Sequence, residues 1–82
     1  MAIKEVSEQL AKLVRFHRKQ SGLSQEQLAT YAGLGKTVVF DIEHAKPTVK
    51  LSTVLSILNV LNIDIKFNSP LMKQMAEKNE KS

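Results

Sequence analysis

The sequence contains no cysteine and no tryptophan among its 82 residues, and it has only three glycines and two prolines. Without cysteine, neither a disulfide nor a thiolate metal site can form, and two histidines, His17 and His44, cannot hold a zinc ion alone. We therefore expect no metal and no cofactor. No run of about 18 apolar residues is present, and residues 1–5 lack the apolar stretch of a signal peptide. These absences predict a cytoplasmic protein without a membrane partner.

Length and charge favour a small binding module over an enzyme. A single domain of 82 residues lies close to the lower size limit for independent stability, and such domains often gain stability from a partner subunit. The 12 basic and 8 acidic residues give a net charge of +4, which permits a nucleic-acid partner without selecting one. Neither histidine belongs to a plausible serine and carboxylate constellation, so we expect no enzyme.

Apolar residues that recur at helical spacing predict an all-α domain of four helices. The predicted helices cover residues 6–20, 25–32, 36–44 and 51–61. Gly22 stops the first helix, Ser24 begins a capping-box sequence at the second, and Pro47 prevents the third from continuing. The fourth helix is apolar on most of its circumference, which predicts burial on two sides.

After the fourth helix the hydrophobic period changes to two, which is typical of a half-buried strand. The predicted strand consists of Ile63, Asp64, Ile65, Lys66 and Phe67. Because the sequence offers no second strand, we expect this one to pair with its copy in a homodimer, with Asp64 facing Lys66 across the two-fold axis. The alternative is a frayed tail. Residues 68–82 predict a weakly ordered polar tail, with at most a helical turn after Ser69 and Pro70.

The second and third helices form a helix-turn-helix layout over residues 24–43, within a domain that spans residues 1–62. Ala29 is small where the two helices must cross closely, and Gly33 permits the sharp turn between them. The apolar side chains that fill the space beneath are Leu28, Leu34, Val39 and Ile42.

The motif contains the run Leu23-Ser24-Gln25-Glu26-Gln27-Leu28-Ala29, then Gly33, then Ile42-Glu43. In these residues it resembles the helix-turn-helix family of Cro and lambda repressor, also called the XRE family, which implies a lambda-repressor-like four-helix fold. Around it stand the segments Gly35-Lys36-Thr37, Asp41-Ile42-Glu43-His44 and Lys46-Pro47-Thr48. With these segments the sequence looks most like the HipB-type antitoxins, which couple this domain to a C-terminal dimerising strand and are often encoded beside a HipA-type kinase toxin.

The resemblance implies that the start of the third helix enters the major groove of DNA. There Lys36 and Thr37 are the candidates for reading base edges, and the amide of Gly35 is placed to approach a phosphate. At the start of the second helix, Gln25 is expected to bind a phosphate together with the amides of the helix terminus.

Three further candidates each leave two interpretations open. Phe40, one turn further along the third helix, either touches a thymine methyl group or packs on the edge of the domain. Lys46 and Thr48, in the following loop, either contact phosphates or are simply solvated.

Two other pairs of residues are assigned to the scaffold and to protein contacts. By the resemblance, Arg18 near the end of the first helix pairs with Glu43 and fixes the third helix against the first. Leu13 and Phe16 lie off the buried stripe of the first helix, where they either pack locally or in the dimer, or form a patch for a protein partner.

The sequence thus predicts a sequence-specific repressor that binds double-stranded DNA at an inverted-repeat operator, as a homodimer, in the cytoplasm at the nucleoid. The resemblance adds that it is the antitoxin of a HipA-like kinase and represses their shared operon. The alternatives are a free-standing XRE-type repressor without a toxin, and an interaction adaptor that has kept the fold and lost DNA affinity. Residues 24–46 carry two lysines against three acidic residues, a net charge of −1, and this keeps the adaptor open.

Overall fold

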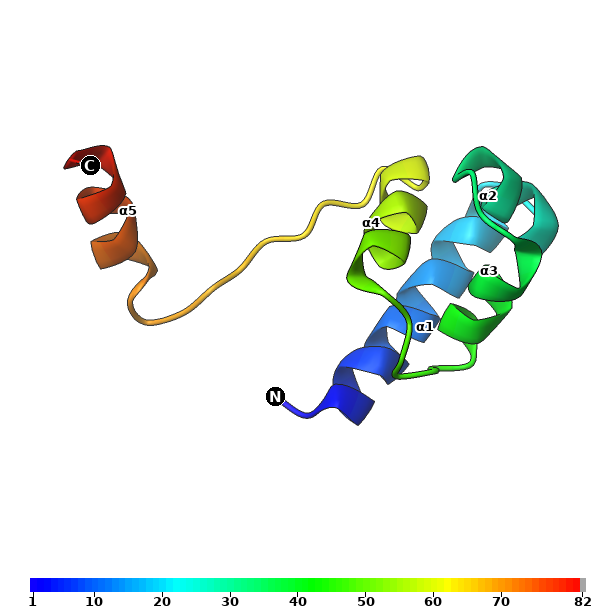
Figure 1. Ribbon diagram of the computed structural model, residues 1–82, viewed down its shortest axis with the longest axis horizontal. Helices are drawn as coiled ribbons and strands as arrows, with labels where there is room; N and C mark the ends of the chain where they lie inside the picture. The colour runs from blue at the N-terminus through cyan, green and yellow to red at the C-terminus, as the bar shows by residue number, and fades with distance from the viewer. Residues whose placement is uncertain (82) are drawn as a thin grey trace.

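The computed structural model describes residues 1–81, with side chains for residues 1–78, and this part of the chain is helical and contains no strand. The helices are α1 (Ile3–Gln20), α2 (Gln25–Tyr31), α3 (Lys36–Glu43), α4 (Leu51–Val60) and α5 (Met72–Lys81). The first four pack together, and an extended segment leads from α4 to α5, which stands apart from them (Figure 1). Within the described residues, no helix combines the length and the apolar character that crossing a membrane requires.

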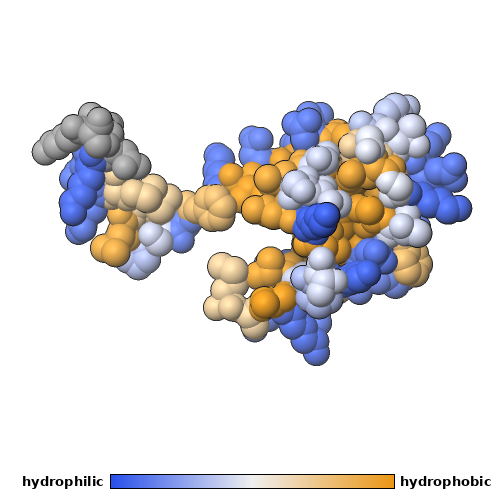
Figure 2. Space-filling model, in the orientation of Figure 1, coloured by the Kyte–Doolittle hydropathy of each residue, from blue (hydrophilic) through white to orange (hydrophobic). Residues whose placement is uncertain are grey.

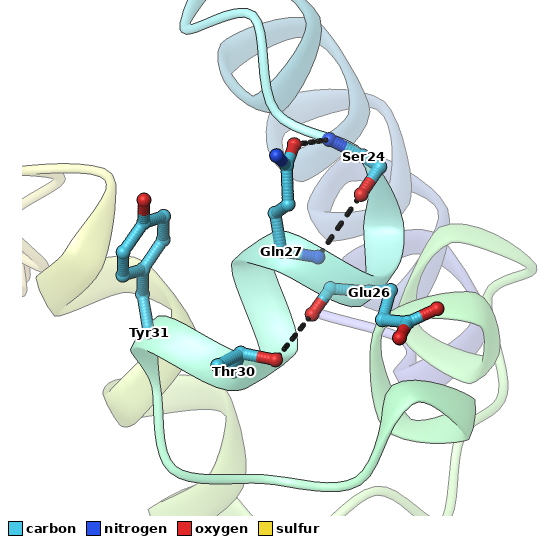
Figure 3. A pocket seen from close by; sticks show the side chains of 5 residues that line it. All are labelled: Ser24, Glu26, Gln27, Thr30 and Tyr31. Carbon is cyan, nitrogen blue, oxygen red and sulfur yellow. Dashed lines mark hydrogen bonds between the residues drawn. The ribbon is translucent and has the colours of Figure 1, made fainter.

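Short-range signals set where α1, α2 and their connections begin and end. At the start of α2, the hydroxyl oxygen of Ser24 accepts a hydrogen bond from the amide of Gln27 at 3.0 Å (Figure 3). The side-chain oxygen of Gln27 accepts from the amide of Ser24 at 2.8 Å, which completes the predicted capping box. Gly22 after α1 and Gly33 after α2 both have a φ of +72°, a left-handed conformation that glycine adopts without strain.

The core lies between α1, α2, α3 and α4. Its buried side chains are Val14, Leu28, Ala29, Val39, Ile42, Ile57, Leu58 and Leu61. The interior positions predicted for the helix-turn-helix motif are confirmed: Leu28, Ala29, Val39 and Ile42 are buried, and Leu34 is partly buried against them. Ala29 is only 1% exposed, so its small side chain lets α2 and α3 approach closely.

One side of α4 is open, which differs from the expectation. Ile57 and Leu58 are buried, but Leu51 is 69% exposed and Leu55 is 45% exposed. The prediction of burial on two sides is therefore wrong for the single chain. The physical reason is that α4 packs mainly against α2 and α3, which cover only its inner side.

The segment after α4 does not form the predicted strand in the single chain. The chain turns at Asn62, whose φ is +58°, and residues 63–69 have no regular secondary structure. A strand needs a neighbour for its amides and carbonyls, and the described residues provide none for residues 63–67. Pairing with a second copy stays a prediction.

The predicted polar tail contains a longer helix than the sequence indicated. The carbonyl oxygen of Ser69 accepts from the amide of Met72 at 3.2 Å, and its hydroxyl oxygen accepts from the amide of Leu71 at 3.3 Å. These bonds satisfy the amides of Leu71 and Met72 at the start of a helix of ten residues, which stands in place of the expected turn. Residue 82 of the predicted tail lies outside the described residues.

Candidate nucleic-acid interface

The outward side of α3 carries the candidate base-reading residues. Lys36, Thr37 and Phe40 are exposed, whereas Val39 and Ile42 on the opposite side are buried in the core. Gly35 precedes the helix and supplies no side-chain cap. The amides of the first turn therefore lack a side-chain acceptor, as a phosphate-binding helix start requires.

A hollow between the starts of α2 and α3, called here the α2–α3 hollow, brings several predicted contacts together. It is lined by Arg18, Ser24, Gln25, Glu26, Lys36, Thr37 and Phe40. Four of these are residues that the sequence predicts to contact DNA: Gln25, Lys36, Thr37 and Phe40. Both helices begin at this hollow, so both positive dipole ends face it.

Sequence reasoning missed two residues of this hollow, Ser24 and Glu26. The side chain of Ser24 is engaged in the capping box, but Glu26 is exposed and adds a negative charge to the hollow that Lys36 also lines. Glu26 directly follows Gln25, which was predicted to contact a phosphate, and this neighbourhood could have indicated that Glu26 belongs to the same site. A phosphate in the hollow must approach Lys36 in the presence of this carboxylate, which weakens simple charge attraction.

Arg18 and Glu43 form the ion pair that the resemblance implied. Arg18 Nε lies 2.6 Å from Glu43 Oε2, and Arg18 Nη2 donates to Glu43 Oε1 at 2.9 Å. The two side chains are 11% and 3% exposed, so the pair is largely removed from water. Arg18 Nη1 also donates to the carbonyl oxygen of Leu23, which fixes the residue that precedes the cap of α2.

Gln25 belongs to the same network, which the sequence did not indicate. Its Nε2 donates to Glu43 Oε1 at 3.2 Å, so the carboxylate of α3 holds side chains from both α1 and α2. Gln25 was predicted only as a phosphate ligand. The structure places it in the α2–α3 hollow with its side chain already oriented by Glu43.

The network changes the pKa of both charged groups. Burial by itself raises the pKa of Glu43, but the hydrogen bonds from Arg18 and Gln25, together with the positive charges of Arg18 and Arg15, outweigh it, so this pKa lies below its ordinary value. The hydrogen bond to Glu43 raises the pKa of Arg18 in spite of burial. Glu43 is therefore ionised and paired at neutral pH.

Lys46 and Thr48 lie outside the α2–α3 hollow. They line a second hollow together with Val38, Asp41, Val49, Lys50 and Thr53. Both are exposed, and Lys46 Nζ lies 3.5 Å from Asp41 Oδ2. Sequence reasoning missed Lys50, an exposed lysine that adds a second cation to this loop surface.

The predicted strand residues lie along α4, away from the α2–α3 hollow. A mostly apolar groove, called here the α4 groove, is lined by Leu51, Leu55, Leu58, Asn59, Ile63, Asp64, Ile65 and Phe67. Lys66, the other residue of the predicted strand, is exposed and is not among those that line the groove. Apolar surface continues from the helical body along the connecting segment (Figure 2). Leu51 and Leu55 were missed as surface residues because α4 was expected to be buried on two sides.

Leu13 and Phe16 are exposed on α1 and line neither hollow. The ring of Phe16 meets the ring of His17 edge to face, with centroids 5.5 Å apart. His17 Nδ1 donates to the carbonyl oxygen of Leu13 at 2.7 Å, so the imidazole that Phe16 contacts is held against the backbone of α1.

Known proteins are similar to this chain over the same region. A family model described as Helix-turn-helix matches residues 14–68, which include the whole α2–α3 hollow. An uncharacterized HTH-type transcriptional regulator, y4mF, of Sinorhizobium fredii is 40% identical over 58 residues, which are 71% of this chain and 76% of the relative. The control protein C.SmaI of Serratia marcescens is 38% identical over 80 residues, which are 98% of this chain and 88% of the relative.

Replacing Glu43 by alanine is expected to lower the free energy of unfolding by about 3 kcal/mol, because Arg18 would keep a largely buried charge without its partner. Urea unfolding measures this change. The matched control is Asp41→Ala, which removes the exposed ion pair with Lys46 from the same helix. This control is expected to change the free energy by less than about 1 kcal/mol. Equal effects of the two substitutions would contradict the role assigned to Glu43.

The same ion pair predicts a dependence of stability on pH. Because the pKa of Glu43 in the folded chain is lower than its ordinary value of 4.5, its contribution is fully present above pH 4.5. The contribution is lost as the pH falls through the lowered pKa. Below pH 4.5, the free energy of unfolding should fall more steeply for the natural chain than for Glu43→Gln, in which this group does not titrate. Urea unfolding at a series of pH values tests this, and parallel curves would argue against it.

Proposed function

Because the chain belongs to the helix-turn-helix family of DNA-binding transcriptional regulators, we propose that it is a sequence-specific repressor that binds an inverted-repeat operator as a homodimer. The observation that carries this proposal is the α2–α3 hollow, where Gln25, Lys36 and Thr37 lie together at the starts of two helices. The proposed activity is binding without catalysis, and it takes place in the cytoplasm at the nucleoid.

In the proposed complex, the start of α3 lies in the major groove. Lys36 donates to the O6 and N7 atoms of guanine, while the hydroxyl and methyl groups of Thr37 face the neighbouring base. Gln25 donates one N–H of its amide to Glu43 and its second N–H to a phosphate. Lys46, Thr48 and the amide of Gly35 contact phosphates on either side, which sets the register of the helix on the duplex.

The α4 groove supports the proposed homodimer. Leu51, Leu55, Ile65 and Phe67 expose apolar surface that a second copy would bury. In an antiparallel ribbon centred on Ile65, the backbone groups of residues 63–67 pair with those of the second copy. Asp64 then faces Lys66 of the second copy, so two opposite-charge pairs form across the two-fold axis. The two α3 helices read half-sites about one or more helical turns apart.

We further propose that the partner is a HipA-like kinase, for which this chain is the antitoxin and with which it regulates a shared operon. The resemblance to the HipB-type antitoxins supports this role, and the exposed pair Leu13 and Phe16 is the candidate contact surface. The second candidate is a free-standing regulator without a toxin. Similarity to a control protein over 98% of this chain favours that candidate. A gene for a kinase next to the gene for this chain would favour the antitoxin, and its absence the free-standing regulator.

Replacing both Lys36 and Thr37 by alanine is expected to weaken operator binding by about tenfold to a hundredfold, because both base contacts are lost. The fold should be unchanged, since both side chains are exposed. Titration of the DNA upstream of the gene against random DNA, at two salt concentrations, measures the loss. The matched control is Lys12→Ala on α1, which removes one exposed lysine away from the hollow and should retain operator selectivity. If the natural chain binds both DNAs equally and weakly, the repressor hypothesis is wrong, and the interaction adaptor becomes the favoured function.

The proposed ribbon predicts the outcome of a charge exchange. Asp64→Lys places two ammonium groups opposite each other across the ribbon, and Lys66→Asp places two carboxylates opposite each other, so each should weaken dimerisation by about three- to tenfold. The double variant restores opposite charges and should dimerise like the natural chain. Sedimentation equilibrium measures the dimer dissociation constant. A double variant that is as weak as either single variant would refute the antiparallel register.

A further inference from the structure

An aromatic side chain stands on the outward side of α3 among polar neighbours. Phe40 is 49% exposed, although Val39 and Ile42 of the same helix are buried in the core and Val38 is partly buried against it. Phe40 lines the α2–α3 hollow beside Lys36 and Thr37. The ring is therefore not packed away on the edge of the domain, and half of it is presented where the proposed repressor meets DNA.

His44 supports this ring from one turn further along the chain. The two rings are stacked, with centroids 3.8 Å apart and an angle of 23° between their planes. His44 Nδ1 donates to the carbonyl oxygen of Phe40 at 2.8 Å, which fixes the imidazole plane. Because one face of Phe40 rests on a fixed ring, its exposed part has little rotational freedom to lose on binding a ligand.

Helical spacing puts this stack in line with Lys36. Residues four apart on a helix share one face, so Lys36 and Phe40 lie in a row on the outward side of α3, and the stacked ring of His44, the residue that caps the helix, continues it. Among the base edges that unmodified DNA displays in the major groove, the C5-methyl group of thymine is the apolar one. The exposed ring of Phe40 is therefore suited to an apolar contact with that methyl group.

Resting on the proposed function, we propose that Phe40, supported by His44, reads the 5-methyl group of a thymine in each half-site of the operator. Four residues of helix rise by about 6 Å, and neighbouring base pairs are about 3.4 Å apart. The thymine therefore lies within about two base pairs of the base that Lys36 contacts. The two-fold symmetry of the dimer places one such thymine in each half-site.

Replacing thymine by deoxyuridine tests this proposal, because it removes the methyl group and leaves base pairing intact. Each thymine of the operator is replaced in turn, together with its symmetry mate, and the affinity of the natural chain is measured. One position per half-site should show a loss of about fourfold for each methyl group removed. Phe40→Ala should bind the thymine operator more weakly and lose all discrimination between thymine and deoxyuridine at that position. Its thermal unfolding, measured in parallel, should match the natural chain because the ring is half exposed.

Tyr31→Ala is the matched control, since it removes another exposed aromatic side chain, on α2, that does not line the α2–α3 hollow. It should keep the full loss on deoxyuridine substitution, and His44→Ala should keep only part of it. Selective operator binding with no sensitive thymine, or with a sensitivity that survives in Phe40→Ala, would overturn this inference and leave the repressor standing. Absence of selective binding by the natural chain would overturn both.

Discussion

The carboxylate of Glu43 joins three helices of the domain. It accepts two hydrogen bonds from Arg18 of α1 and one from Gln25 of α2, and it belongs to the last residue of α3. A planar guanidinium that meets a carboxylate with two hydrogen bonds fixes an orientation as well as a distance. Well-packed apolar side chains in the same place would often stabilise the fold equally well. The feature that the ion pair adds is the fixed angle at which α3 presents its outward side.

The angle of α3 matters because only a few residues of this helix are available for contacts with DNA. Of its eight residues, Val39 and Ile42 face the core and Glu43 is held in the network. Residues 24–46 have a net charge of −1, so long-range attraction to phosphates contributes little in this region. Affinity must then come from a small number of correctly placed contacts, and a small rotation of α3 would disturb all of them together. A modest dependence of binding on salt concentration is the corresponding expectation.

Features encoded within a few residues could be predicted from the sequence. The cap formed by Ser24 and Gln27 and the left-handed turns at Gly22 and Gly33 depend on neighbours within one helical turn, and the structure confirms them. The bond between Gln25 and Glu43 could not be predicted in this way, because it joins residues 18 positions apart and exists only once α2 and α3 have packed.

Two predictions, burial of α4 on two sides and a strand over residues 63–67, are not met in the single chain, and the reason is a different one. Hydropathy indicates that a surface avoids water, but it does not indicate which chain covers that surface. Within the described residues of one chain, Leu51 and Leu55 remain 69% and 45% exposed, and no strand pairs with residues 63–67. A second copy resolves both differences at once, which is why these two departures from the sequence-based fold are arguments for the proposed dimer.

The position of α4 also bears on how far apart the two α3 helices of such a dimer would lie, and therefore on the spacing of the half-sites that it would bind. Ile57 and Leu58 share one core with Val39 and Ile42 of α3, while Leu51 and Leu55, together with Leu58, line the α4 groove. The route from the candidate base-contacting residues Lys36 and Thr37 to the proposed dimer interface therefore passes through close-packed side chains, which deform little. By contrast, residues 63–69 form an extended connection to α5 with no regular structure of their own. A dimer held by α4 would fix the separation of its two α3 helices, whereas a dimer held only by residues 63–67 would let that separation vary. For the proposed dimer to select a single half-site spacing, the exposed side of α4 with Leu51 and Leu55 would therefore have to be part of the interface, together with residues 63–67.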